Sequence, residues 1–335
     1  DESLSLAITH GHHEAAARAY NNLAEFGVEF RDFALAEKTI EAGLAFDTEH
    51  DLDAWTHYLS GRLAQLRVDQ GRFEDARAIA QGIVSKEELP LLSRLPAKLV
   101  LAKVSMRLGL DGFETLMEEA LSDALATDEL QYSVPARFTY LEWAWLTDAA
   151  GRAAEHMEKL NQLGVNDRHP WNIGARAIWA DRLGQGRASL GRAEIPEPYK
   201  LELAGHYLEA ASAWTLLGLP YEAALVRSRQ QTAEAITTSL QQLSALNARL
   251  ASEKLSRDAR HLGLAIELPD MKRGPYRAAR SHPMGLTAKE QIVLRYLKDG
   301  LSNKDIAERL NRSQRTIEHH VASILNKLSA PNRMA

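Results

Sequence analysis

A chain of 335 residues is too long for one small core, so we expect two or more domains. Its composition, 45% hydrophobic and 25% charged, is typical of a soluble globular protein, and the lack of cysteine excludes disulfides, thiolate zinc sites and a cysteine nucleophile. The net charge of −5 hides an asymmetry, because residues 272–335 carry 13 basic and 5 acidic side chains whereas residues 1–271 carry 27 basic and 40 acidic ones. This split predicts a basic nucleic-acid module attached to an acidic body.

The sequence has no membrane or secretion signal. No run of about 18 apolar residues occurs, and no signal-peptide pattern, so neither membrane insertion nor secretion is indicated. The chain opens on Asp1 rather than Met, as a fragment or a processed product would.

The first two-thirds of the chain predicts a repeated helical body. It is rich in Ala, Leu, Glu and Arg, and its apolar residues recur at spacings of three and four. A turn followed by a short helix with small residues on one side recurs every 40 residues, and looser turns follow at Gly186 and Gly218. The turns and their small residues are Arg31-Asp32-Phe33 with Ala34 and Ala36, Gly71-Arg72-Phe73 with Ala76 and Ala80, Asp111-Gly112-Phe113 with Ala120 and Ala124, and Gly151-Arg152-Ala153 with Ala153 and Ala154. Such a period indicates an α-solenoid, in which each helical pair buries its face on the next.

These hairpins resemble tetratricopeptide repeats, although the period exceeds the usual ~34 residues and the full signature is absent. Longer first helices would account for the excess. We therefore expect residues 1–268 to form a tetratricopeptide-like α-solenoid of helical hairpins that binds a signal or a partner.

Aromatic side chains are the candidates to line the concave surface of such a solenoid. Trp143 and Trp145 lie about 200° apart on one helix, so they cannot both face the same core, and one of them is a candidate for a groove. The alternative for each aromatic, and the more common one, is packing between hairpins. The candidates are Trp55, Tyr58, Tyr140, Trp143, Trp145, Trp171 and Trp179.

No catalytic motif stands out. The dipeptide Gly-Lys is missing, which excludes a standard phosphate-binding P-loop, and neither His-Glu-x-x-His nor Gly-x-Ser-x-Gly occurs. His10, His12 and His13 form a dense histidine group, but without a carboxylate frame they fit a solvated helix start better than a metal site. We expect no enzymatic activity, no metal and no cofactor.

Helical periodicity stops at Leu268-Pro269, and residues 269–284 are predicted to form a basic linker rich in Pro and Arg. The positive charge of this linker fits two alternatives: the linker contacts a phosphate backbone, or it is simply a solvated tether.

Three capped helices are predicted in residues 285–335. Thr287 to Glu290 is a capping box that opens a helix running to about Lys298, and Gly300 ends it. Ser302 caps a second helix of about eight residues, which ends near Leu310. Ser313 caps a third, running to about Leu328. The short helix and the tight corner after it are the geometry of a helix-turn-helix.

The third helix has one apolar stripe and one polar side. The stripe consists of Ile317, Val321, Ile324, Leu325 and Leu328, and it is expected to pack on Val293, Leu294, Leu297, Ile306, Ala307 and Leu310. The opposite side is expected to present Arg315, His319, Ala322, Ser323 and Asn326, with Glu318 on its flank. In a domain of net positive charge, such a side fits the DNA major groove.

The segment GLTAKEQIVLRYLKDGLSNKDIAERLNRSQRTIEHHVASILNKL resembles the LuxR-type (FixJ/NarL/GerE) DNA-binding domain of bacterial transcription regulators. The resemblance covers roughly the last 50 residues of the chain. The matching positions are Leu286-Thr287-x-x-Glu290, Gly300-Leu301-Ser302-Asn303-Lys304-x-Ile306-Ala307, Leu310-x-x-Ser313-x-x-Thr316-Ile317-x-x-His320-Val321 and Ile324-Leu325-x-Lys327-Leu328.

The resemblance implies roles for individual residues. Glu318, His319 and Ala322 would face bases from a recognition helix at about 314–328. Phosphates would be held by Asn303, Lys304, Arg315, Thr316 and Lys327. Some relatives have Lys at the first and third base-facing positions, from which Glu318 and Ala322 depart. Ala322 could contact a thymine methyl group, and Glu318 could accept from a cytosine amino group or, alternatively, pair with Arg315 on the surface.

The remainder of the chain has a weaker likeness. The helical repeats and the Pro/Arg-rich linker resemble the C-terminal halves of large MalT-like regulators, which carry an amino-terminal ATPase region. This sequence lacks that region, so two expectations stand: the downstream part of such a protein, or an independent regulator.

The function implied is a cytoplasmic bacterial transcription regulator, nucleoid-associated when DNA-bound. Its expected partners are double-stranded promoter DNA, RNA polymerase, a protein or small-molecule effector on the solenoid, and a second copy as a homodimer. The family usually dimerises through a fourth helix, which Pro331 could begin. One alternative is a protein-interaction scaffold with a repurposed helix-turn-helix, which the basic tail argues against. A second is a sigma-like polymerase subunit, which would need a promoter-melting aromatic helix that the sequence lacks.

Overall fold

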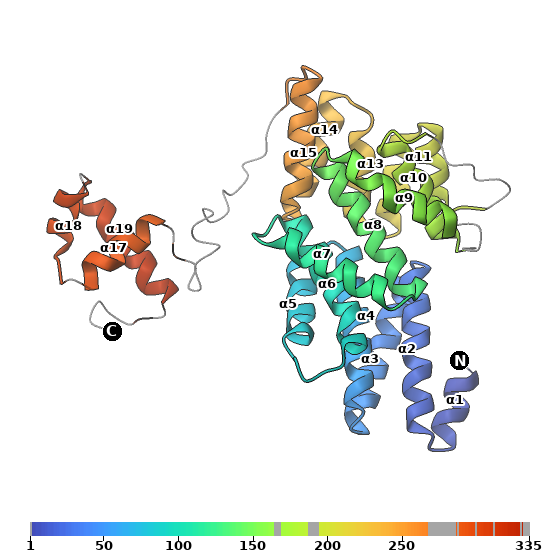
Figure 1. Ribbon diagram of the computed structural model, residues 1–335. Coiled ribbons are helices and arrows are strands. Elements are labelled where there is room, and N and C mark those ends of the chain that lie inside the picture. Colours follow the sequence, from blue (N-terminus) through green and yellow to red (C-terminus); the bar gives the residue numbers. More distant parts are fainter. Residues whose placement is uncertain are drawn as a thin grey trace. The chain divides into compact units, whose positions relative to one another are not determined.

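The computed structural model describes residues 2–163, 169–186, 194–266, 286, 288–298, 300–310, 312–328 and 330 (Figure 1). Within these ranges it has 18 helices and no strand, so the all-α prediction is confirmed. The chain divides into two compact units, Asp1–Pro269 and Asp270–Ala335. The predicted linker at 269–284, the cap residue Thr287 and the fourth helix predicted from Pro331 lie outside the described residues.

The first unit is an array of helices in which each helix packs on the next along the chain. The helices are α1 (Glu2–Thr9), α2 (His13–Glu29), α3 (Phe33–Glu49), α4 (Asp53–Asp69), α5 (Phe73–Val84), α6 (Leu91–Leu108), α7 (Phe113–Ala126), α8 (Leu130–Leu146), α9 (Ala150–Leu163), α10 (Pro170–Arg182), α11 (Glu197–Ala204), α12 (Tyr207–Leu216), α13 (Pro220–Ser228), α14 (Ala233–Ala245) and α15 (Arg249–His261). The contacts of α4 with both α2 and α6, and of α6 with α8, stack successive hairpins. This stacking is the solenoid arrangement.

Helix lengths account for the 40-residue period. The first helix of the hairpin is the longer one in α4–α5, with 17 against 12 residues, in α6–α7, with 18 against 14, and in α8–α9, with 17 against 14. In α2–α3 both helices have 17 residues, so the predicted excess in the first helix does not hold there. Left-handed residues at Gly11, Arg31, Asp51 and Gly71 end successive helices every 20 residues.

Small residues let the helices approach closely, as expected. A Cβ at Gly27 would lie 2.8 Å from the backbone nitrogen of Ala36, so α2 and α3 meet almost backbone to backbone. Ala76, Ala80, Ala120, Ala124 and Ala153 are buried as well, whereas Ala34 and Ala154 are exposed. One predicted turn was misplaced, because Gly151 to Ala153 lie in the first turn of α9 and the reversal occurs at Asp148, whose φ is 57°.

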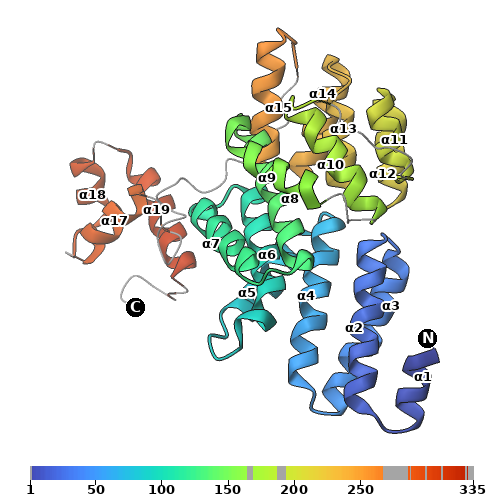
Figure 2. The same cartoon turned by 45° about the vertical axis from the view of Figure 1, so that its right-hand side comes forward.

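The array curls until its late helices meet the turns of its early ones (Figures 1 and 2). Phe73, at the start of α5, makes an edge contact with Tyr221 of α13 at 5.7 Å between ring centroids. At Gly71, where φ is 76°, a Cβ would lie 2.9 Å from the Pro220 ring. The last helix, α15, also packs against α6 and α8, so helices distant in sequence meet at more than one place in the array.

Asp47 on α3 is a buried carboxyl without a compensating contact. Its side chain is fully buried, and neither carboxylate oxygen has a hydrogen-bond partner among the described residues. Burial, together with the negative charge of Glu14, raises the pKa of Asp47 to about 6, and His50 opposes the shift. The ionised form is therefore costly in the folded protein.

We predict that Asp47→Asn stabilises the first unit in a pH-dependent way. Because the folded pKa lies above the usual 3.8, wild-type stability falls as the pH rises through the interval from 3.8 to about 6. The variant avoids that loss, which amounts to at most about 3 kcal/mol at pH 8. Thermal unfolding at pH 4.5 and pH 8 measures the gain, and a gain no larger at pH 8 than at pH 4.5 contradicts the assignment.

Candidate nucleic-acid interface

The second unit contains three short helices, α17 (Ala288–Lys298), α18 (Asn303–Arg309) and α19 (Gln314–Lys327). Gly300, with a φ of 79°, lies between α17 and α18, where the sequence predicted the first helix to stop. A residue with a side chain would adopt this left-handed conformation only with strain. The turn at Gly300 thus sets where α18 begins.

The start of α18 is a complete capping box. The Asp305 backbone N–H donates to Ser302 Oγ at 3.2 Å, and the Ser302 backbone N–H donates to Asp305 Oδ2 at 3.0 Å. The hydrogen bonds from Ser302 lower the pKa of Asp305, which stays ionised and favours the positive end of the helix. The predicted cap at Ser302 is confirmed.

The start of α19 is capped in a similar way by Ser313. The Thr316 backbone N–H donates to Ser313 Oγ at 3.2 Å, and the two hydroxyl groups lie 2.7 Å apart. The Thr316 hydroxyl, expected to face a phosphate, therefore lies beside the cap of α19. This end of the helix is fixed before any ligand binds.

A single apolar core joins the three helices. Ile317, Val321 and Ile324 of α19 are buried against Val293 of α17 and Ile306 of α18. The rest of the predicted stripe and its expected partners pack around them: Leu294, Leu297, Ala307, Leu310, Leu325 and Leu328. The apolar side of α19 is thus covered, as the sequence predicted, and Arg315, Glu318, His319 and Ala322 on its other side are exposed.

One predicted position on the outer side was wrong. Ser323 is half-buried, and its hydroxyl donates to Glu290 Oε1 at 2.7 Å. Glu290 itself is only 4% exposed, so this hydrogen bond ties α17 to α19 inside the unit. Sequence reasoning assigned Glu290 only to a capping box. The sequence did contain a signal for its burial. Glu290 lies one helical turn before the buried Val293 and therefore on the same face of the helix.

The three predicted base-facing residues are all exposed on α19. Glu318, His319 and Ala322 lie within one turn of one another, and the Gln314 side chain donates to Glu318 Oε1 at 3.0 Å. No ion pair joins Glu318 to Arg315, although the structure describes both side chains. The carboxylate of Glu318 is instead oriented by its amide neighbour Gln314, one turn earlier.

The predicted phosphate-facing residues differ in exposure. Lys304 and Arg315 are exposed, and Asn303 and Thr316 are half-buried. The backbone of Lys327 ends α19, but its side chain and that of Asn326 lie outside the described residues. Among the predicted phosphate contacts, Lys304 near the start of α18 and Arg315 near the start of α19 are thus exposed cations.

Metal binding finds no support in the described part of the chain. It contains no group of three or more His, Cys, Asp or Glu side chains placed to hold a metal ion. The rings of His10 and His12 lie 6.2 Å apart, and His13 packs on His50 with 3.9 Å between ring centroids. Nor is any helix in the described ranges long and apolar enough to cross a membrane.

Comparison with known proteins agrees with the geometry of this unit. Residues 284–335 match the family model of bacterial regulatory proteins of the luxR family. Over 47 residues the chain is 53% identical to the Fimbriae Z protein of Salmonella typhimurium, and over 50 residues it is 46% identical to the nitrate/nitrite response regulator protein NarP of Escherichia coli. The chain thus carries a luxR-family helix-turn-helix domain at its C-terminal end.

These similarities cover a small part of each protein. The match to the Fimbriae Z protein spans 14% of this chain and 22% of that protein, and the match to NarP spans 15% and 23%. No solved structure matches the chain significantly. The helical unit 1–269 therefore has to be interpreted from its own residues.

We predict that Ser323→Ala destabilises the second unit by about 1–3 kcal/mol, because a buried carboxylate loses a charge-assisted hydrogen bond. Amide hydrogen exchange in the full chain checks this, with protection of α17 and α19 expected to fall by about 5- to 150-fold. Ala322→Ser, on the exposed side of the same helix, is the matched control and should cause a much smaller loss. Equal losses in the two variants would show that the Glu290 contact contributes nothing.

Proposed function

We propose that the protein is a sequence-specific DNA-binding transcription regulator. The observation that carries the proposal is the luxR-family domain at 284–335, whose α19 is capped, covered on its apolar side and exposed on its polar side. A helix of this kind, supported by a second short helix, has the dimensions to enter the major groove. Activity of the whole chain is inferred from this one domain.

In this proposal some residues of α19 contact the bases, and other residues of α19 and of the start of α18 contact the phosphates. Glu318, His319 and Ala322 face base edges, where Glu318 accepts from a cytosine amino group and Ala322 contacts a thymine methyl. Backbone phosphates are held by Asn303, Lys304, Arg315, Thr316 and Lys327. The phosphate contacts supply affinity and orientation, and the base contacts supply sequence preference.

The charge distribution supports this division. Residues 272–335 have 13 basic and 5 acidic side chains, whereas the acidic excess of the first 271 residues disfavours contact with DNA. We propose that residues 1–268 sense a protein or small-molecule signal, that 269–284 link the two parts, and that 285–335 bind promoter DNA. RNA polymerase and a second copy of the chain are further proposed partners.

We predict that Lys304→Ala and Arg315→Ala weaken DNA binding to every sequence alike. Each variant should lower the slope of log K against log salt concentration by about 0.9, because one phosphate contact is lost. Fluorescence anisotropy with a labelled duplex at several salt concentrations measures both effects. Lys38→Ala, at an exposed lysine of α3 in the acidic unit, is the control and should change neither. Unchanged slopes in both helix-turn-helix variants would refute the phosphate roles.

We predict a different result for Glu318→Ala. Because Glu318 is proposed to read a base, its loss should relax or change the preferred base at one position by about 1–3 kcal/mol of discrimination. The salt slope should stay the same. Competition between duplexes that differ at single positions measures the change. A uniform change at all positions would instead indicate that Glu318 acts only through the overall charge.

A further inference from the structure

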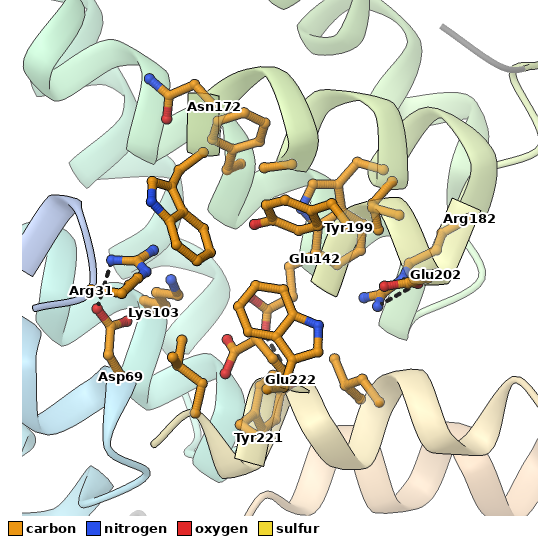
Figure 3. A pocket seen from close by; sticks show the side chains of 18 of the residues that line it. Arg31, Asp69, Lys103, Glu142, Asn172, Arg182, Tyr199, Glu202, Tyr221 and Glu222 are labelled. Carbon is orange, nitrogen blue, oxygen red and sulfur yellow. Dashed lines mark hydrogen bonds and ion pairs between the residues drawn. The ribbon is translucent and has the colours of Figure 1, made fainter. Parts of the chain in front are cut away.

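The concave interior of the first unit holds a cavity of about 140 Å³ lined by charged and aromatic side chains (Figure 3). Its walls come from α6, α8, α10, α11, α12 and α13, together with Arg31, which follows α2, and Asp69, the last residue of α4. The sequence pointed to Trp171 and Trp179, which line it, but not to its charged residues. For scale, an engineered cavity of about 150 Å³ accepts benzene.

On one side of the cavity, Arg107, Glu142 and Tyr221 form a buried network of hydrogen bonds. Arg107 of α6 donates through Nε and Nη2 to the two oxygens of Glu142 of α8, at 2.8 and 3.0 Å. The Tyr221 hydroxyl donates to the same carboxylate at 2.8 Å, and the Arg107 guanidinium lies 3.8 Å from the centre of the Tyr221 ring. Burial alone would raise the pKa of Glu142, but the charge and hydrogen bonds of Arg107 hold it below its usual value. Glu142 is thus fully engaged by the protein.

Two charged groups of the same cavity each have one atom without a hydrogen-bond partner among the described residues. Glu222 of α13 has one oxygen 3.3 Å from Arg107 Nη2, while its Oε2 is buried and accepts no hydrogen bond from the described residues. Arg107 Nη1 is likewise buried and unpaired within the described part of the chain. Buried polar atoms left in this state cost free energy, which a ligand with matching groups would recover.

Lys103 supplies a second basic side chain, one helical turn before Arg107. It lines the cavity, and among the residues described no hydrogen bond or close ion pair engages its ammonium group. Burial and then the charge of Arg107 lower the pKa of Lys103, whereas the charges of Glu142, Asp69 and Glu222 raise it by less. In Figure 3, Lys103 and Glu222 extend from different helices into the same hollow.

Aromatic rings form the remaining wall. Trp171, Tyr199 and Trp214 contact one another with centroid distances of 5.0 to 5.8 Å, which fixes their orientation. Tyr199 is partly buried, and burial raises its pKa, so it remains a neutral ring surface. This wall suits an apolar side chain.

We infer that the cavity binds a small zwitterionic amino acid, with its carboxylate beside Lys103 and Arg107 Nη1, its ammonium beside Glu222 Oε2, and its side chain against Trp171 and Trp214. A zwitterion supplies both an acceptor for Arg107 Nη1 and a donor for Glu222 Oε2, and it adds no net charge to the cavity. A simple anion would leave Glu222 Oε2 without a donor, and a simple amine would leave Arg107 Nη1 without an acceptor. The inference rests on the proposed function only in taking this ligand as the signal of the regulator.

Calorimetric titration of the full chain with each of the twenty common L-amino acids tests the inference. A small apolar member is expected to bind. For the strongest binder, its analogues without the amino group and without the carboxylate group should each bind at least about 100-fold more weakly, because each leaves one buried polar atom of the cavity without a partner. Absence of binding by all twenty at 10 mM overturns the inference, and so does an analogue that binds as tightly as its parent.

Two variants separate recognition from a folding defect. The Lys103→Met variant should no longer bind the amino acid, but it should keep the weak affinity for the analogue without the carboxylate group. The Glu222→Gln variant should likewise no longer bind the amino acid, but it should keep the weak affinity for the analogue without the amino group. Lys38→Met, on an exposed face, is the matched control and should bind as the wild type does. A variant that loses both analogues while its circular dichroism is unchanged contradicts the assigned poses. If an amino acid binds and DNA affinity does not respond, the site stands and the sensing role fails.

Discussion

The buried contact of Arg107 with Glu142 and Tyr221 organises the first unit. It joins α6, α8 and α13, three helices that are far apart in the sequence, and both charges are nearly inaccessible to water. Such a pair contributes little net stability relative to an apolar replacement, but breaking it by removing one partner costs about 3–5 kcal/mol. We therefore interpret it as a device that selects one arrangement of the curled array. The cavity beside it exists because those helices are held in this arrangement.

The stability of the second unit is limited by a different constraint, its small size. With fewer than 70 residues it has one apolar core, so each cap and buried hydrogen bond carries a large share of its stability. Ser302 with Asp305 and Ser313 with Thr316 fix where α18 and α19 begin. The hydrogen bond from Ser323 to Glu290 joins α19 to α17 in the interior of the unit. The polar side of α19 is consequently presented on a fixed frame.

Local signals made much of this fold predictable. Caps, glycine turns and apolar stripes depend on residues close in sequence, and they located α17, α18 and α19 to within one or two residues. The 40-residue period similarly revealed the helical hairpins. The misplaced turn near Gly151 and the outward assignment of Ser323 share a cause. In both cases the outcome was set by a residue outside the pattern, Asp148 in one and Glu290 in the other. The cavity was not predictable, because the partners of Arg107 lie 35 and 115 residues away.

The central claim is that this chain binds particular DNA sequences through its C-terminal domain. Selection of bound duplexes from a random DNA pool by the full chain, in moderate salt, tests it most directly. The account predicts enrichment of a defined motif at which α19 reads one groove, with weaker salt-dependent binding to the unselected pool. Failure to enrich any motif or to retain DNA at low salt, while hydrogen exchange shows α17 to α19 folded, would contradict it.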